Sequence, residues 1–168
     1  EMIFRDGFYH ADPHPGNLMM LDGGVVGVLD CGMAGYIDEE LRQEFEELLL
    51  AAVQNDGREL TDIIIRLGSV PPELERRTLQ SEISEFLADY VGQSLENFDL
   101  SGALNGMTDI IRRYRVILPS SCSMLLKVLV MLEGTSRQLD PKFNLAELLS
   151  PYYAKAVKRR FSPKKLLH

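Results

Sequence analysis

Residues 10–17 read HADPHPGN, and this stretch decides how the rest of the chain is interpreted. Pro13 and Pro15 each fix φ and lack a backbone donor, so the stretch forms neither a helix interior nor a central strand. Two histidines, an aspartate and an asparagine therefore share one rigid loop. Because loops on a rigid scaffold often carry binding and catalytic residues, we expect this loop to belong to a functional site.

The loop by itself allows three interpretations. The simplest is a tight turn whose histidines are satisfied by local hydrogen bonds. A second is a zinc or iron site, because His10, Asp12 and His14 alternate, and alternate side chains of an extended segment share a face. Apart from these three residues Cys31 is the only soft ligand nearby, and the two prolines lie between the candidates and restrict the geometry of the three-ligand set that catalytic zinc usually has. The ligand count argues against a metal site of this kind.

The third interpretation is phosphoryl transfer, because the loop has the spacing of a protein-kinase catalytic loop. That loop contains His-x-Asp followed, after four further residues, by Asn, and His10, Asp12 and Asn17 match it. A segment of hairpin length then leads to Asp-Cys-Gly at residues 30–32, an Asp-x-Gly triplet. Either half alone would be a weak signal, but the two halves in this order indicate a phosphoryl-transfer site.

The chemistry of phosphoryl transfer explains these residue types. Asp12 would accept or orient the proton of an attacking hydroxyl or water. Asn17 and Asp30 would hold Mg²⁺ through oxygen atoms, and two protein oxygens suffice because the ion keeps waters and nucleotide phosphates as its other ligands. We expect Gly16 and Gly32 to permit backbone turns that a Cβ would obstruct.

The remainder of the chain predicts a β-hairpin followed by helices. The apolar runs around Asp22, Gly23 and Gly24 favour a hairpin with its turn at these residues. Acidic residues 38–40 favour a helix start, and everything beyond them is expected to be helical. Apolar stripes mark helices over 41–52, 79–91, 104–114 and 119–140, with a last helix over 144–153. The stretch 124–132 is apolar nearly all round, which predicts a buried central helix.

Composition limits the class of protein. The 168 residues are 45% hydrophobic and 26% charged, which is typical of one soluble globular domain with a real core. Two cysteines, Cys31 and Cys122, make no disulfide framework, so a reducing compartment is expected. The longest apolar stretch, 124–132, contains Lys127 and is too short to span a bilayer.

The net charge of −7 is unevenly distributed. All 25 acidic residues lie before residue 148, whereas six of the 18 basic residues lie in 155–168. The acidic body argues against nucleic-acid binding. The basic tail also carries Phe161, Leu166 and Leu167, which allows a peripheral contact with a membrane surface or a partner; the alternative is a solvated helix end.

Three stretches resemble the UbiB family of atypical kinases: GFYHADPHPGN at 7–17, VLDCGMAG at 28–35 and EGTSRQLDPKFN at 133–144. The resemblance implies an α+β, mainly α fold, namely a protein-kinase-like C-terminal lobe with a small β-hairpin at the catalytic loop and a helical bundle after it. We expect a single domain over 1–168. It would comprise catalytic and metal-binding loops in 1–36, a helical part in 37–154 and a basic tail in 155–168, with the N-terminal lobe absent from this chain.

The resemblance also implies roles for individual residues. The family's catalytic aspartate falls on Asp12, and its metal-binding asparagine and aspartate fall on Asn17 and Asp30, with ATP and Mg²⁺ as cofactors. His10 takes the place of the kinase loop histidine, which has a structural role. His14 belongs to the family's motif, and we expect it to orient Asp12.

The sequence also departs from ordinary protein kinases. Ala11 replaces the arginine of the usual catalytic loop, and no Ala-Pro-Glu segment follows Asp30. Cys31 stands where Phe is common, so a packing role is expected for it. Glu133 and Asp140, in the late motif, are expected to be structural.

The resemblance implies an ATPase or small-molecule kinase that supports isoprenoid-quinone or prenyl-lipid metabolism. Its parent protein would be membrane-associated in bacteria, mitochondria or plastids, with prenyl-lipid or quinone-pathway proteins as partners. The fragment alone is expected to be soluble and inactive, because the phosphate-covering loop and its lysine belong to the N-terminal lobe. Two alternatives remain: a phosphotransferase of the aminoglycoside or choline kinase kind, and a non-catalytic scaffold for lipid enzymes.

Overall fold

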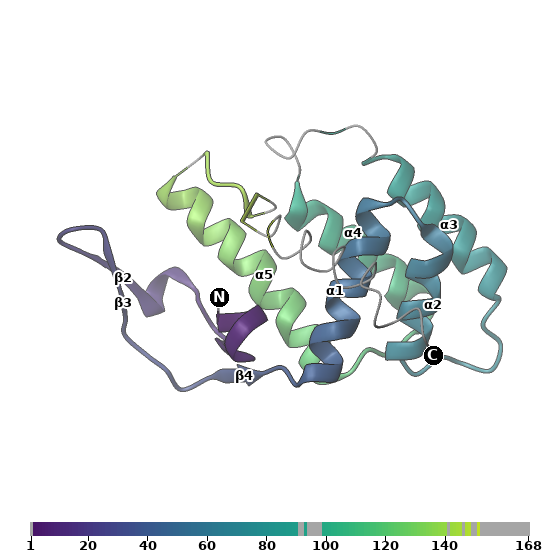
Figure 1. Cartoon of the computed structure of the whole chain (residues 1–168), viewed down its shortest axis with the longest axis horizontal. Helices are drawn as coiled ribbons and strands as arrows, with labels where there is room; N and C mark the ends of the chain where they lie inside the picture. The colour runs from purple at the N-terminus through teal and green to yellow at the C-terminus, as the bar shows by residue number, and fades with distance from the viewer. Residues whose placement is uncertain are drawn as a thin grey trace, which may run out of the picture.

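The computed structural model describes residues 2–90, 93, 99–140, 142–145, 147, 148 and 151. Within them, two small antiparallel β-ribbons near the N-terminus precede five α-helices (Figure 1). This arrangement confirms the predicted α+β, mainly α fold. The division of the chain into catalytic loops, helical part and basic tail stays a prediction.

All four strands precede the five α-helices, and two short helical segments lie one before the first strand and one between the first two strands. The first part consists of η1 (Met2–Asp6), β1 (Phe8–His10), η2 (Pro15–Asn17), β2 (Leu18–Leu21), β3 (Val25–Val28) and β4 (Ala34–Tyr36). The helices are α1 (Glu39–Val53), α2 (Gly57–Leu67), α3 (Arg76–Ala88), α4 (Leu100–Arg113) and α5 (Ser120–Leu139).

The predicted hairpin is confirmed as the β2–β3 ribbon. Its register places Leu21 opposite Val25, and the turn uses Gly23 and Gly24 at φ values of +79° and +76°, which glycine adopts without steric cost. The second ribbon pairs β1 with β4 and was not predicted. Its strands have three residues each, too few to show an alternating pattern.

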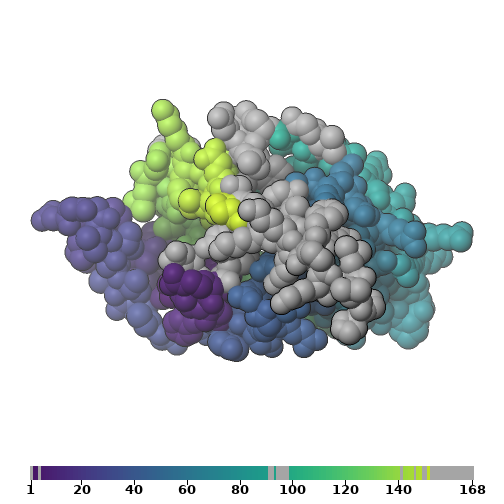
Figure 2. Space-filling model, in the orientation of Figure 1, coloured from purple at the N-terminus to yellow at the C-terminus, as the bar shows by residue number. Residues whose placement is uncertain are grey.

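The β2–β3 hairpin projects away from the helices (Figure 2). Its strands carry exposed apolar side chains on both faces. The neighbouring pairs Met20–Val26 and Leu21–Val25 lie on opposite faces, and all four side chains are exposed. Continuous apolar runs of this kind are typical of strands covered on both faces. The hairpin therefore offers two uncovered apolar surfaces beside the loop at 10–17.

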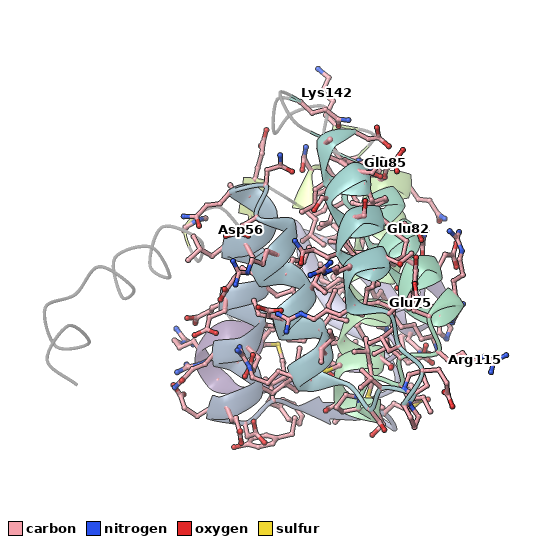
Figure 3. The ribbon with its side chains drawn as sticks, turned by 90° about the vertical axis from the view of Figure 1, so that its right-hand side faces the viewer. Asp56, Glu75, Glu82, Glu85, Arg115 and Lys142 are labelled. Atoms are coloured by element: carbon pink, nitrogen blue, oxygen red, sulfur yellow. The ribbon has the colours of Figure 1, made fainter. Side chains whose placement is uncertain are left out.

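Helices α1, α2 and α4 each begin at an aspartate whose side chain caps the helix, whereas α3 and α5 have no side-chain cap. The Asp38 carboxylate accepts a hydrogen bond from the Leu41 N–H at 2.8 Å, so α1 begins at the acidic cluster, as predicted. The predicted helix over 41–52 corresponds to α1, whereas none of the predicted apolar stripes marks α2, which begins at Gly57. Asp56, labelled in Figure 3, caps α2 by accepting from the Glu59 N–H at 2.9 Å.

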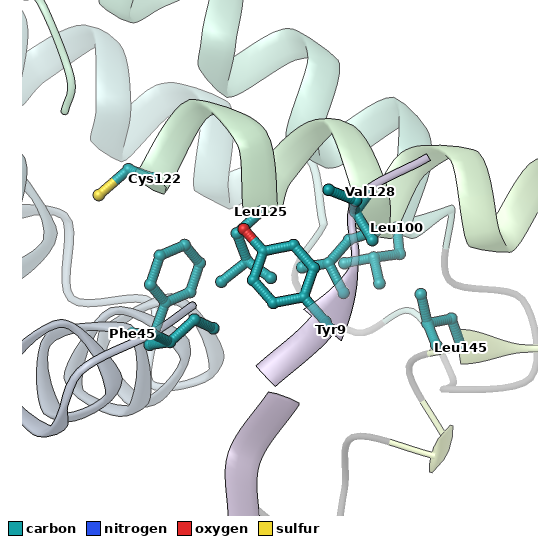
Figure 4. Packing of buried hydrophobic residues seen from close by; sticks show 10 residues of the cluster. Tyr9, Phe45, Leu100, Cys122, Leu125, Val128 and Leu145 are labelled. Carbon is teal, nitrogen blue, oxygen red and sulfur yellow. The ribbon is translucent and has the colours of Figure 1, made fainter. Parts of the chain in front are cut away.

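Two apolar clusters form the core. One joins the β region to α1 and α5 and includes Tyr9, Ala11 and Phe45 (Figure 4). The other lies among α2, α3 and α4, with Ile63, Leu79 and Ile83 fully buried in it. The first cluster positions the loop at 10–17, because both Tyr9 and Ala11 are anchored in it.

Helix α5 is buried along only part of its circumference. Leu125 and Val128 lie in the first cluster, whereas Lys127 and Ser123 are exposed. The prediction of a buried central helix is therefore correct for its core-facing side only. The helix ends at Leu139, as the Asp-Pro pair at 140–141 predicts.

The C-terminal predictions fall mostly outside the described residues. Of the expected last helix over 144–153, the described residues 145, 147, 148 and 151 are helical. Asn144 precedes them, and its Oδ1 accepts a hydrogen bond from the Glu147 N–H at 3.4 Å. The basic tail at 155–168 is not described. In the part of the chain that is, no helix is both long and apolar enough to cross a membrane.

The two cysteines should differ sharply in reactivity. Cys31 is exposed and Cys122 is buried, and burial raises the pKa of the Cys122 thiol to about 11. The thiolate is the reactive form, so at about pH 8 we expect a thiol reagent to modify only Cys31 in the folded protein. Mass spectrometry of the labelled protein, before and after denaturation, checks this. Equal labelling rates for the two cysteines in the folded state would contradict it.

Candidate active site

The loop between β1 and β2 alternates between buried and accessible residues. Ala11 and Pro13 are buried, whereas Asp12 and His14 are partly exposed. The Ala11 N–H also donates to the carbonyl oxygen of Met33 at 3.0 Å. The core thus holds the backbone of the loop from one side, so Asp12 and His14 face outward on a fixed support.

His10 joins the loop to the triplet at 30–32. Its Nδ1 accepts a hydrogen bond from the Asp12 N–H at 3.1 Å, and its Nε2 lies 2.5 Å from the carbonyl oxygen of Asp30. Because Nδ1 is an acceptor, Nε2 carries the proton of the neutral ring and donates to Asp30. One imidazole therefore connects the two halves of the predicted site.

Asn17 lies against Asp12. Its Nδ2 donates to the Asp12 carbonyl oxygen at 3.1 Å and to the Asp12 Oδ2 at 3.4 Å. This leaves the Asn17 Oδ1 without a hydrogen-bond donor among the described residues. The arrangement fixes the direction of the amide, because only the nitrogen can donate to Asp12.

His14 faces the same oxygen of Asp12. Its Nδ1 accepts from the Gly16 N–H at 2.9 Å, which caps η2, so its neutral ring also carries the proton on Nε2. That nitrogen lies 3.7 Å from the Asp12 Oδ2, too far for a hydrogen bond but close enough for electrostatic attraction. Asn17 and His14 both lie at Oδ2, so Oδ1 is the oxygen of Asp12 left for another group.

Asp30 is exposed, and one of its two carboxylate oxygens accepts a hydrogen bond. Its Oδ1 accepts from the Gly32 N–H at 2.7 Å, and Oδ2 has no hydrogen bond within the described chain. Gly16 and Gly32 do not have a positive φ, but the space that a Cβ would need at each position is occupied by a neighbouring side chain. A Cβ at position 16 would lie 2.7 Å from the His14 ring, and one at position 32 would lie 3.0 Å from the Asp30 Oδ1. Both glycines allow a neighbouring side chain to approach closely.

The free oxygens of Asn17 and Asp30 are hard donors of the kind that Mg²⁺ prefers. They fit an ion whose other ligands are water and phosphate oxygens. By contrast, no three His, Cys, Asp or Glu side chains in the described ranges are grouped so that they could hold a metal ion. The zinc or iron interpretation of His10, Asp12 and His14 therefore gains no support.

Two family models match the chain in succession. The ABC1 atypical kinase-like domain matches residues 1–64, which contain the loop and the triplet, and the UbiB helical domain matches residues 83–144. The chain belongs to the ABC1/UbiB family of atypical kinases. The resemblance found in the motifs is thereby confirmed, and the ABC1 match covers all the predicted site residues.

Curated relatives of this family span most of the chain. An uncharacterized protein in the hydrogenase 1 5' region of Clostridium pasteurianum is 30% identical over 90% of the chain and 28% of its own length. An uncharacterized, chloroplastic aarF domain-containing protein kinase of Arabidopsis thaliana is 29% identical over 96% of the chain and 23% of its own length. A probable protein kinase UbiB of Xylella fastidiosa is 26% identical over 98% of the chain and 31% of its own length. The chain thus spans less than a third of each relative. No solved structure matches it.

The late motif contributes contacts within the UbiB helical domain. Glu133 is buried, and its Oε2 accepts from the Ser101 N–H at 2.6 Å and the Ser101 hydroxyl at 2.5 Å. Its Oε1 lies 2.9 Å from a terminal guanidinium nitrogen of Arg137. The Asp140 Oδ1 accepts from the Lys142 N–H at 3.0 Å. These contacts join α5 to the start of α4 and shape the end of α5, which fits the structural roles expected for both acids.

Sequence reasoning missed one residue near the loop. The hydroxyl of Thr135, which is buried on α5, donates to the Pro13 carbonyl oxygen at 3.4 Å. Thr135 lies seven residues after Val128, on the side of the helix that faces the core. A polar residue at this place in an apolar stripe was the available signal.

The contacts of His10 and His14 predict their tautomers. In both rings Nδ1 accepts a backbone N–H, so in the neutral form of each ring we expect the proton on Nε2. A two-bond proton–nitrogen correlation spectrum of the imidazoles distinguishes the tautomers. The denatured chain should show the usual mixture of both. A proton on Nδ1 of either ring in the folded chain would contradict the arrangement of the loop.

Proposed function

We propose that this chain supplies the catalytic and metal-binding residues of a Mg²⁺- and ATP-dependent enzyme that transfers a phosphoryl group or hydrolyses ATP. The observation that carries the proposal is the link through His10, which ties the loop with Asp12 and Asn17 to the backbone of Asp30. The family supports it, since relatives are named as probable protein kinases.

In this proposal Asp12 acts as the base or orienting group. Its Oδ1 receives or directs the proton of the attacking hydroxyl or water, because Oδ2 already accepts from Asn17. Asn17 Oδ1 and Asp30 Oδ2 hold the ion. When bound, Mg²⁺ neutralises charge on the nucleotide phosphates. His10 keeps the two loops at a fixed separation, so that these groups require no rearrangement before reaction.

We place the groups that cover the phosphates outside these 168 residues. The exposed apolar faces of the β2–β3 hairpin support this arrangement. They lie next to the loop, and exposed apolar surface of this kind is typical of a binding surface, here for further protein and for the base of the nucleotide. On this view the isolated chain binds nucleotide weakly and turns over little.

We further propose that the reaction supports isoprenoid-quinone or prenyl-lipid metabolism. The support is the resemblance of the motifs at 7–17, 28–35 and 133–144, together with the UbiB name of several relatives. The proposed partners are proteins of that metabolism and a membrane surface contacted by the basic tail at 155–168. Nucleic acid is not among the proposed partners, because the rest of the chain is acidic.

The metal role of Asp30 can be tested with Asp30→Asn, which keeps the size of the side chain and removes its charge. We expect Mg²⁺-dependent binding of ATP to weaken by about tenfold or more, because even residues that only support metal ligands cost that much. Calorimetric titration of the protein with a complete ABC1 domain measures this. Asp22→Asn, the same change in the exposed hairpin turn, is the matched control. Unaltered Mg²⁺-ATP affinity in Asp30→Asn would overturn the site.

The role of Asp12 can be separated from binding. We expect Asp12→Asn to lower kcat for ATP turnover by about 100-fold or more, the size of a general-base contribution, with little change in ATP affinity. A coupled assay for ADP release and the same titration measure both quantities. Full activity in Asp12→Asn would contradict its role. If the unaltered protein neither binds nor turns over ATP, the scaffold alternative is favoured instead.

A further inference from the structure

The threonines of the helices differ in where their hydroxyls donate. Thr61 in α2 donates to the Gly57 carbonyl at 2.6 Å, and Thr108 in α4 donates to the Leu104 carbonyl at 2.7 Å. Each bond lies within one helix and spans four residues, the usual choice of a helical threonine. Thr135 in α5 instead donates to the carbonyl of Pro13, which lies 122 residues away in the sequence.

The acceptor of this bond lies at a sensitive place in the loop. The proline ring already fixes φ of Pro13, and Asp12, as the residue before a proline, is restricted to extended backbone. The orientation of the Pro13 carbonyl sets its ψ, which is the torsion that directs the chain into His14. The bond from Thr135 therefore fixes the main remaining freedom between Asp12 and His14.

The donor is held in place as firmly as the acceptor. Two residues before Thr135, the buried carboxylate of Glu133 binds the backbone and hydroxyl of Ser101 at the start of α4, where a negative charge is favourable. Arg137 lies beside the other oxygen of Glu133. The hydroxyl of Thr135 thus projects from a part of α5 that cannot turn without breaking buried contacts.

We propose that Thr135 is a positioning residue that fixes the Pro13–His14 peptide and so holds Asp12 in the direction needed for phosphoryl transfer. This inference rests on the proposed function for its effect on turnover. Thr135 lies in the match to the UbiB helical domain and Pro13 in the match to the ABC1 domain. The helical domain therefore contributes directly to the shape of the catalytic loop.

The effect on the loop can be tested without any activity. Thr135→Val removes the hydroxyl at nearly constant volume and leaves a buried carbonyl unpaired. We expect hydrogen exchange at the backbone amides of Asp12 and Asn17 to accelerate by about fivefold or more. Thr135→Ser restores the hydroxyl and should restore slow exchange. Thr61→Val, the same change at a buried hydroxyl bonded within its own helix, should leave these amides unchanged. Equal exchange in Thr135→Val and the unaltered chain would overturn the proposal.

The effect on turnover is measured in the protein with a complete ABC1 domain. We expect Thr135→Val to lower kcat by about tenfold, as small misplacements of catalytic groups do, while KM for ATP stays constant and Thr135→Ser recovers the rate. A kcat equal to that of Thr61→Val would overturn the proposal. If the unaltered protein shows no turnover, the proposed function fails, and the exchange experiment alone decides the role of Thr135.

Discussion

The site depends on one imidazole held between two backbone groups. His10 accepts the N–H of Asp12 and donates to the carbonyl of Asp30, so one ring with one tautomer connects two loops separated by the whole β2–β3 hairpin. Backbone bonds from Ala11 to Met33 and from Leu29 to Asn17 join the same segments, and the ring adds a direct link between the backbones of Asp12 and Asp30. Because each ring nitrogen has its own obligatory role, replacement by a side chain with a single polar atom cannot reproduce the link.

The apolar core and the β1–β4 ribbon hold the residues on either side of this link in place. Tyr9 and Ala11, on either side of His10, are buried in the cluster formed with α1 and α5, and β4 pairs with β1 directly after the triplet. The loop is thus fixed by apolar packing at its back and by Thr135 in the middle. Buried and accessible residues alternate along it, so packing and chemistry use different side chains of the same short stretch.

The sequence predicts those features that depend on residues close together in the chain. The prolines, the kinase-like spacing of His10, Asp12 and Asn17, and the double glycine of the hairpin turn are all local signals, and the structure brings His10, Asp12 and Asn17 together. The β1–β4 ribbon and the contact of Thr135 with Pro13 depend on partners far apart in the chain, and no local pattern identifies which residues pair. Helix α2 was not among the predicted stripes, and its start is set by the Asp56 cap rather than by Gly57, which is a poor helix former.

The hairpin has a consequence for handling the chain as an isolated protein. A two-stranded ribbon has an unpaired edge on each strand, and in the described residues neither β2 nor β3 pairs with a further strand. Natural proteins protect such edges with charge, proline or cover, but the strand residues here are aliphatic, methionine or glycine. An uncovered apolar edge of this kind is a template on which another strand can pair, so the isolated chain is expected to need low protein concentrations in solution.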